Sequence, residues 1–164
     1  MKILIDGYYR FLKMVLTLLM GLMLVPVILQ IVSRYFDMIP RFIWTEEVAR
    51  FCFVWIIMIG SMIAVRDGAH FDVDLLPHPR SSKGKAVFQL IVHLAMSLMA
   101  LVFIRFGFDF ARLGIVQSSE MSEINMLSIY ISFPLAGASW LLFLSEKIVI
   151  DIDLIFETDS GEKA

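Results

Sequence analysis

Four long stretches of the chain carry no charged residue, and they constrain its fold more than any other feature. They cover residues 14–33, 51–65, 86–104 and 124–145. A helix rises about 1.5 Å per residue, so about 20 apolar residues cross the roughly 30 Å hydrocarbon layer of a membrane. Helices suit this layer because their backbone polar groups are bonded within the segment. The pattern predicts an all-α integral membrane protein with four transmembrane helices.

The second uncharged run is too short to cross the hydrocarbon layer alone. As a helix, residues 51–65 cover about 22 Å, so the charged residues on both sides must lie close to the lipid. Thr45 is a suitable N-cap, and Glu46 and Glu47 follow in the first turn, where the helix dipole favours anions. The sequence therefore predicts a short interfacial helix start before the second span.

The predicted organisation is one transmembrane domain followed by a tail. The four-helix domain covers residues 1–145, and a tail that is amphipathic and then acidic covers 146–164. The domain's spans are predicted at 14–33, 48–66, 86–104 and 124–145.

Composition argues against several functional classes. Hydrophobic residues make up 59% of the 164 residues, above the roughly one half that is typical of soluble domains. The net charge of −2, without a basic run, argues against nucleic acid as a partner. Cys52 is the only cysteine, which excludes an intrachain disulfide. No nucleophile with a base, phosphate-binding loop or metal-ligand spacing is found, so we expect neither an enzyme nor a cofactor.

Lysine and arginine predict the orientation of the spans. With four spans, both termini and the 66–85 loop lie on one side of the membrane, and the connections 35–43 and 114–123 lie on the other. The first side carries Lys2, Arg10, Lys13, Arg66, Arg80, Lys83, Lys85, Lys147 and Lys163, and the second carries Arg34, Arg41, Arg50, Arg105 and Arg112. Because cytoplasmic loops are enriched in these residues, both termini are predicted to be cytoplasmic.

His93 is the only titratable residue in the third run. A haem bound by two histidines would need a second one within a span, but His70 and His78 both lie in the 66–85 loop, so haem is not expected. A histidine inside a membrane marks a candidate functional site. A hydrogen-bonded packing role is nevertheless the simpler interpretation of His93.

The stretch 44–74 combines charged residues with an apolar centre. Glu46 and Arg50 are four residues apart, so they share a helix face and can pair in the more favourable order. These charges can simply mark where a short helix meets water, with Trp44 at the headgroup level. Charges near lipid are costly unless they are paired, so a face that contacts a partner is an equal alternative.

The same stretch resembles the signature of a known family. It reads W-T-E-E-x-A-R-F-x-F-V-W, then G-S-x-x-A-x-R-x-G-A-H, then V-D. The residues that carry this order are Trp44, Thr45, Glu46, Glu47, Ala49, Arg50, Phe51, Phe53, Val54, Trp55, Gly60, Ala64, Arg66, Gly68, His70 and Asp74. The order is similar to that of the small, four-helix DctQ-type membrane subunit of tripartite ATP-independent periplasmic (TRAP) transporters.

The resemblance implies a function that needs partners. The family's small subunit packs against a much larger membrane subunit, which carries the sodium and substrate sites. A soluble periplasmic protein delivers the solute, typically an organic carboxylate such as a C4-dicarboxylate or a sialic acid. The small subunit is implied to be a scaffold in the bacterial inner membrane.

The resemblance also implies where the charged residues of this stretch act. At the periplasmic face, near the large subunit or the binding protein, would lie Trp44, Glu46, Glu47 and Arg50. At the cytoplasmic face would lie Arg66, His70 and Asp74. None of them would bind substrate.

Small residues in two spans are candidate helix-packing sites. Gly60 and Ala64 lie in the second span, and Ala136 and Gly137 lie at the centre of the fourth. Small residues let helices approach closely where lipid removes the hydrophobic drive for association. Contact with another subunit and packing inside this chain are both consistent with the pattern.

A different class, a self-assembling small membrane exporter, is the alternative. In that case Glu46 or Glu47 would be the carboxylate that couples transport to protons. Both residues precede the uncharged run 51–65, whereas a coupling carboxylate is expected inside a span. A neighbouring gene for a large membrane partner would favour the TRAP subunit over the exporter.

Overall fold

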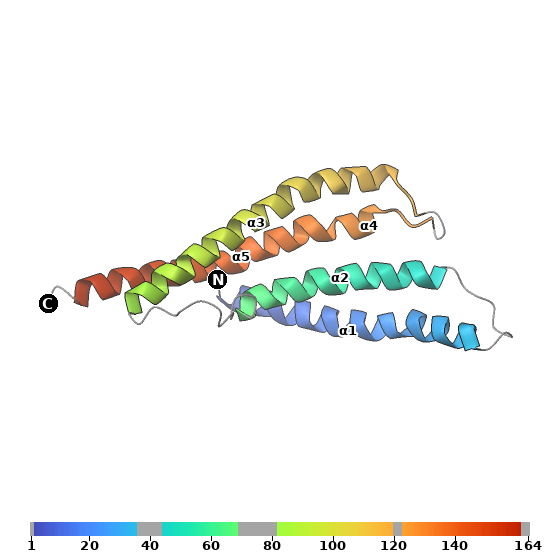
Figure 1. Ribbon diagram of the computed structural model, residues 1–164, viewed down its shortest axis with the longest axis horizontal. Helices are drawn as coiled ribbons and strands as arrows, with labels where there is room; N and C mark the ends of the chain where they lie inside the picture. The colour runs from blue at the N-terminus through green and yellow to red at the C-terminus, as the bar shows by residue number, and fades with distance from the viewer. Residues whose placement is uncertain (1, 36–43, 69–81, 120–122, 162–164) are drawn as a thin grey trace.

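The computed structural model describes residues 2–35, 44–68, 82–119 and 123–161, and these residues are almost entirely helical (Figure 1). Within these ranges the only β-type pairing is an isolated bridge between Ser118 and Asn125. The elements are α1 (Lys2–Tyr35), α2 (Trp44–Asp67), α3 (Ser82–Val116), α4 (Leu127–Tyr130) and α5 (Ser132–Gly161).

Four helical segments are long and apolar enough to cross a membrane, which confirms the predicted all-α fold with four candidate spans. α4 and α5 together form the fourth of them. The segments are Ile3–Tyr35, Trp44–Asp67, Val87–Val116 and Leu127–Asp153. Which side of the membrane the termini face stays a prediction.

α2 defines two ends of the bundle, which we call the Trp44 end and the Arg66 end. α1 begins and α5 ends towards the Arg66 end (Figure 1). The connection between α3 and α4 lies at the Trp44 end (Figure 1). This arrangement is the one expected for a chain that crosses a layer four times.

The first and third helices extend well beyond the uncharged runs that predicted them. α1 begins at Lys2 rather than at residue 14, and α3 ends at Val116 rather than at residue 104. An uncharged run marks only the part of a helix that can lie in the hydrocarbon layer of the membrane. Helical hydrogen bonding continues into flanking charged residues, which can pair along the helix as Arg105 and Asp109 do, four residues apart.

Two further boundaries differ from the expectation. α5 continues without a break through 146–161, the segment expected to form a tail, and this segment holds no proline or glycine before Gly161. α2 begins at Trp44, so Thr45 is not the N-cap but a buried residue of the first turn. Helix ends are commonly uncertain by one or two residues in sequence-based assignment.

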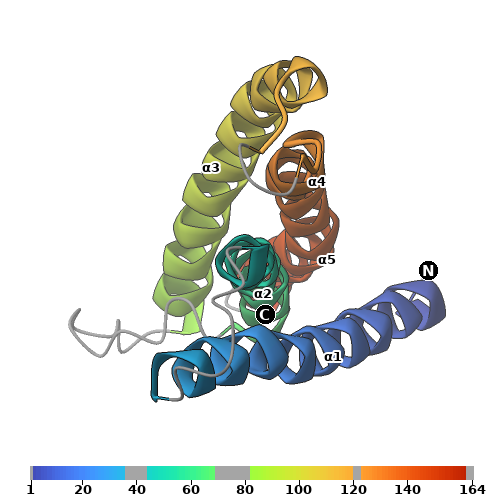
Figure 2. The same ribbon diagram turned by 90° about the vertical axis from the view of Figure 1, so that its right-hand side faces the viewer.

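α2 and α5 form the centre of the bundle. α1 packs along α2, α3 packs along α5, and α2 packs against α5. α2 therefore lies between α1 and the α3–α5 pair (Figure 2). The buried core comprises Ile5, Leu12, Ile59, Met62, Ile63, Val65, Ala136, Phe143 and Leu144.

The backbones of α3 and α5 approach closely at glycine positions. A Cβ at Gly137 would lie 2.7 Å from the carbonyl oxygen of Ala100, and one at Gly107 would lie 2.8 Å from the ring of Pro134. Gly114, two turns after Gly107, meets the backbone of Leu127 at 2.7 Å in the same way. Glycine thus provides the space for this helix pair, as small residues do in membranes generally.

The break between α4 and α5 has a local cause. Pro134 has no backbone N–H to donate to the carbonyl of Tyr130, and its ring would crowd that carbonyl. α4 ends at Tyr130 and α5 begins at Ser132, so Pro134 lies in the first turn of the new helix, where proline is tolerated. The chain nevertheless keeps a right-handed helical conformation at Ile131, so the fourth span stays helical with a local irregularity before Pro134.

The glycine contacts lead to a first prediction. Gly137→Val should destabilise the chain relative to Gly60→Val, because a Cβ at Gly60 would meet nothing within 4 Å whereas one at Gly137 would meet backbone. Both variants carry the same change in helix propensity, so the difference reports the clash, for which we expect about 1–3 kcal/mol. Thermal unfolding of the full chain in detergent measures it. Equal melting temperatures would contradict the packing described here.

Candidate functional site

At the Trp44 end, two adjacent carboxylates point in different directions. Glu46 pairs with Arg50 at 3.7 Å, and their side chains are 74% and 66% exposed. Glu47 is only 9% exposed and accepts a hydrogen bond from the hydroxyl of Ser119, which follows α3. Trp44 is exposed. Of the four docking residues predicted at this end, Trp44, Glu46 and Arg50 are therefore exposed, whereas Glu47 is bonded within this chain.

α4 and the connection before it are bonded to α2 and α3. The indole N–H of Trp55 donates to the carbonyl oxygen of Ser128 at 2.9 Å. Asn125 donates its amide to the carbonyl of Ile115 at 3.0 Å and accepts from the backbone N–H of Leu127 at 2.8 Å. Sequence reasoning missed the contact of Trp55 because its partner Ser128 lies 73 residues further along the chain.

At the Arg66 end, one guanidinium joins three helices. Arg66 of α2 pairs with Asp6 of α1 and with Glu146 of α5, the latter at 3.5 Å. Its guanidinium carbon lies 5.2 Å from the ring centre of Tyr9 and 5.4 Å from that of Phe143. The Arg66 side chain is 21% exposed. Whether it also contacts another subunit stays a prediction, and the partners that the structure shows belong to this chain.

The end of α2 is secured by two further contacts. The hydroxyl of Tyr9 donates to the carboxylate of Asp67, and the ammonium of Lys147 donates to the carbonyl oxygen of Val65 at 2.9 Å. A cation near the last carbonyls of a helix also interacts favourably with the helix dipole. Gly68 follows with φ of +75°, a conformation that glycine adopts at helix ends without strain.

Beyond the end of α2, a histidine and an aspartate pair between α3 and α5. The Nδ1 atom of His93 lies 2.5 Å from Oδ2 of Asp151, and the two side chains are 16% and 6% exposed. The sequence predicted a hydrogen-bonded packing role for His93 but offered no partner. Asp151 was assigned to the tail, and only the continuation of α5 brings it opposite His93.

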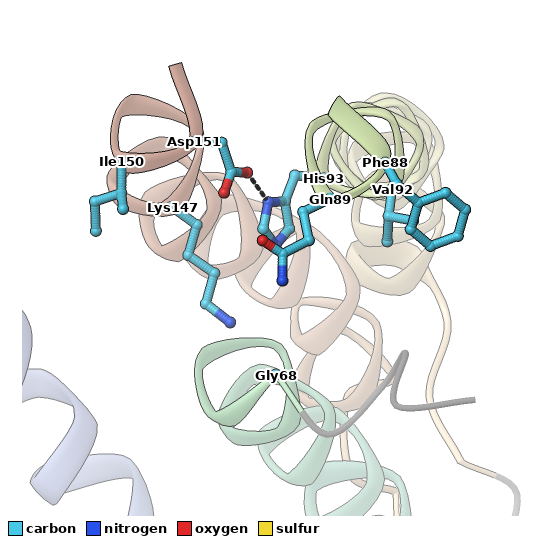
Figure 3. A pocket seen from close by; sticks show the side chains of 8 residues that line it. All are labelled: Gly68, Phe88, Gln89, Val92, His93, Lys147, Ile150 and Asp151. Carbon is cyan, nitrogen blue, oxygen red and sulfur yellow. Dashed lines mark hydrogen bonds and ion pairs between the residues drawn. The ribbon is translucent and has the colours of Figure 1, made fainter. Parts of the chain in front are cut away.

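This pair lines an open cleft of about 330 Å³ (Figure 3). Lys147 reaches from α5 towards Gly68, while His93 and Gln89 project from α3 into the same space (Figure 3). Phe88, Val92 and Ile150 add apolar wall. No group of three or more residues in the described ranges could hold a metal ion.

The remaining candidate residues are placed as follows. Ala136 is fully buried and Gly137 packs on α3, so both serve contacts within this chain. Gly60 leaves open space and Ala64 is half-buried, so the surface of α2 near Gly60 stays available to another helix. His70 and Asp74 lie outside the described residues.

These observations define a class before they define a family. The described residues form a small four-helix membrane protein in which several polar side chains bond helices of the same chain to one another. The chain matches the family model "Tripartite ATP-independent periplasmic transporters, DctQ component" over residues 10–153. It therefore belongs to the DctQ family of TRAP transporter small permease subunits, and it is a transporter subunit rather than an enzyme.

Individual relatives agree with the family match. Two Haemophilus influenzae proteins named as TRAP transporter small permease proteins are each 23% identical to the chain. One alignment covers 84% of the chain and 85% of the relative, and the other covers 79% and 82%. The sialic acid TRAP transporter permease protein SiaT of Haemophilus influenzae is 35% identical over 80 residues, 49% of this chain and 13% of that protein.

The family match also decides between the two classes that the sequence left open. A TRAP small permease is one component of a larger transporter, whereas the exporter would assemble from copies of itself. Glu46 and Glu47 have neighbours suited to a structural role, an arginine one turn away and a serine hydroxyl.

The contacts of Arg66 lead to a second prediction. Arg66→Met should lower the free energy of unfolding by about 2 kcal/mol or more, because it leaves Asp6 and Glu146 without their cation in a partly buried place. Arg105→Met is the matched control, since its pair with Asp109 is 71% and 48% exposed and such pairs contribute less than about 1 kcal/mol. Chemical denaturation in detergent measures both. Similar losses in the two variants would argue against a joining role for Arg66.

Proposed function

We propose that this chain is the small scaffold subunit of a sodium-coupled TRAP transporter that imports an organic carboxylate, such as a C4-dicarboxylate or a sialic acid. It acts in the bacterial inner membrane with a large transport subunit and a periplasmic substrate-binding protein. The chain itself binds neither solute nor sodium. Its role is to enlarge the fixed part of the transporter against which the transporting part moves.

One comparison carries this proposal. In SiaT the segment similar to this chain makes up only 13% of the protein, so a DctQ-like segment there belongs to a much larger permease. In that relative the DctQ-like segment is covalently joined to the rest of the permease. This supports a non-covalent association of this chain with a separate large subunit. The name of that relative also supports a carboxylate solute, because a sialic acid is a carboxylate.

The arrangement of polar groups supports a scaffold. In the described ranges some charged side chains, such as Arg66 and His93, bond one helix to another. Others, such as Glu46, pair with a residue of the same exposed helix face. Secondary transporters instead place broken helices around a polar site at mid-membrane. A chain whose polar groups stabilise its own packing is suited to support a moving partner.

A third prediction tests the function directly. Proteoliposomes that hold this chain together with the large subunit should take up the solute when binding protein and a sodium gradient are supplied. Liposomes that hold this chain alone should take up none, because its sequence places no charged residue at the centre of a span. Radiolabelled uptake is the measurement, with omission of each component as the control. Uptake by the chain alone would refute the scaffold role.

The exposed residues at the Trp44 end are proposed as the docking site. Trp44, Glu46 and Arg50 share the start of α2 and are exposed, and Gly60 offers open space further along the same helix. Charge complementarity at such a rim sets specificity and association rate more than affinity. We place this end at the periplasmic face, where both the large subunit and the binding protein are accessible.

A fourth prediction concerns this docking site. Arg50→Glu should weaken co-purification with the large subunit or reduce uptake several-fold without loss of the chain from the membrane, because it sets like charges against Glu46 and reverses the charge offered to a partner. Glu46→Arg in the same chain should restore part of the loss. Arg105→Glu, another exposed arginine paired four residues away, is the control. Unchanged complex yield and uptake for Arg50→Glu would leave the cluster as a plain helix boundary.

Orientation is a separate part of the proposal. Both termini and the 66–85 loop are proposed to be cytoplasmic because Lys and Arg are more frequent on that side. Cysteines introduced singly at Ser82 and Ser118 should differ in labelling by an impermeant reagent added outside cells whose outer membrane has been opened. Cys52 is buried, so background labelling is low. Labelling of Ser82→Cys but not Ser118→Cys would show the inverse orientation.

A further inference from the structure

The cleft beyond the end of α2 is large enough for part of a ligand. Its volume of about 330 Å³ falls in the range of small-molecule sites, roughly 300–1,000 Å³. A water molecule occupies about 30 Å³, so one or two ordered waters would not fill the space. The cleft contains residues of three helices, since Gly68 ends α2, His93 belongs to α3 and Lys147 belongs to α5.

The polar atoms of the cleft favour an anion. Lys147 carries three N–H donors. One of them is used on the carbonyl of Val65, so two remain for a ligand in the part of the chain that the structure describes. The Gln89 amide and the His93 ring nitrogen that faces away from Asp151 add polar atoms beside it (Figure 3). The Asp151 carboxylate repels an anion in the cleft less than an exposed carboxylate would, because His93 binds its Oδ2 atom and its side chain is 6% exposed.

Polar side chains face the inside of the cleft, and the helix surfaces around it are largely apolar. His93 and Asp151 are turned inwards between α3 and α5. Most exposed side chains next to them are apolar, namely Ile91, Leu94, Val149, Ile150 and Ile152, although Gln89 and Asp153 are exposed as well. A helix pair in water would show the opposite arrangement. This apolar surface indicates contact with lipid, and the polar cleft lies beside it.

From this geometry we propose that the cleft binds the phosphate group of a membrane phospholipid. The ammonium of Lys147 is the main donor to the phosphate, and Phe88, Val92 and Ile150 line the path of the lipid chain. Basic pockets between membrane helices are suited to lipid headgroups, since a phosphate there meets charge while its acyl chain stays in hydrocarbon. The site goes beyond the proposed function and does not depend on the large subunit.

The test is a lipid titration of the full-length chain. The chain is purified in detergent, stripped of lipid, titrated with phosphatidylglycerol and followed by native mass spectrometry. Lys147→Gln should weaken binding about tenfold, because it removes a charge-assisted hydrogen bond while an amide can still donate to Val65. Lys13→Gln, an exposed lysine of α1 at the same end but outside the cleft, should bind as the unaltered chain does.

Two further measurements distinguish the outcomes. Val92→Trp fills the cleft without a change of charge and should also weaken binding, which separates loss of space from loss of charge. Melting temperatures without lipid show that each variant is folded. Inorganic phosphate at the same concentration should not displace the lipid, and displacement would overturn the lipid as occupant. Equal binding by Lys147→Gln and the unaltered chain, or an equal loss in Lys13→Gln, would overturn the site.

Discussion

Polar groups in hydrocarbon must find partners inside the protein, and Arg66 shows how this chain meets that constraint. Its guanidinium bonds to Asp6 and Glu146 and lies against Tyr9, so one side chain of α2 joins α1 and α5. α1 has few other links to α5, among them the hydrogen bond of 2.7 Å between Tyr8 and Ser139. The position of α1 in the bundle therefore depends on polar contacts as well as on the apolar core, to which it contributes Ile5 and Leu12.

The two ends of the bundle use their charges differently. At the Arg66 end the described charged groups of α2 are bonded to the neighbouring helices, with Asp67 bound by Tyr9 as well. At the Trp44 end Glu46 and Arg50 pair along their own helix and remain exposed within the part of the chain that the structure describes. An ion pair with such exposure adds little to stability. Its charges are available to a second protein at little cost to the fold, as a docking site requires.

The number and type of the helices could be predicted because uncharged runs of span length have few alternatives in a membrane. Helix ends could not, since helices continue past the uncharged runs into charged residues, and α5 reaches Gly161. The pair between Glu46 and Arg50 followed from helix periodicity. His93 and Asp151 lie 58 residues apart, and no local pattern predicts their contact. Gly137 was predicted as a helix-packing residue, but its partner Ala100 and the contact of Gly107 with Pro134 follow from no local pattern.

The residues of the family motif in α2 therefore do not all belong to one surface that contacts a partner. Among its residues, Glu47 binds Ser119, Trp55 binds the carbonyl of Ser128, and Arg66 joins three helices. Gly68, also in the motif, adopts the left-handed conformation that ends α2. These residues build the small subunit itself, and the part of the motif left facing outwards is short. Because α2 stops at this glycine while α3 and α5 continue, the same motif residue that ends the helix also borders the cleft beside Lys147.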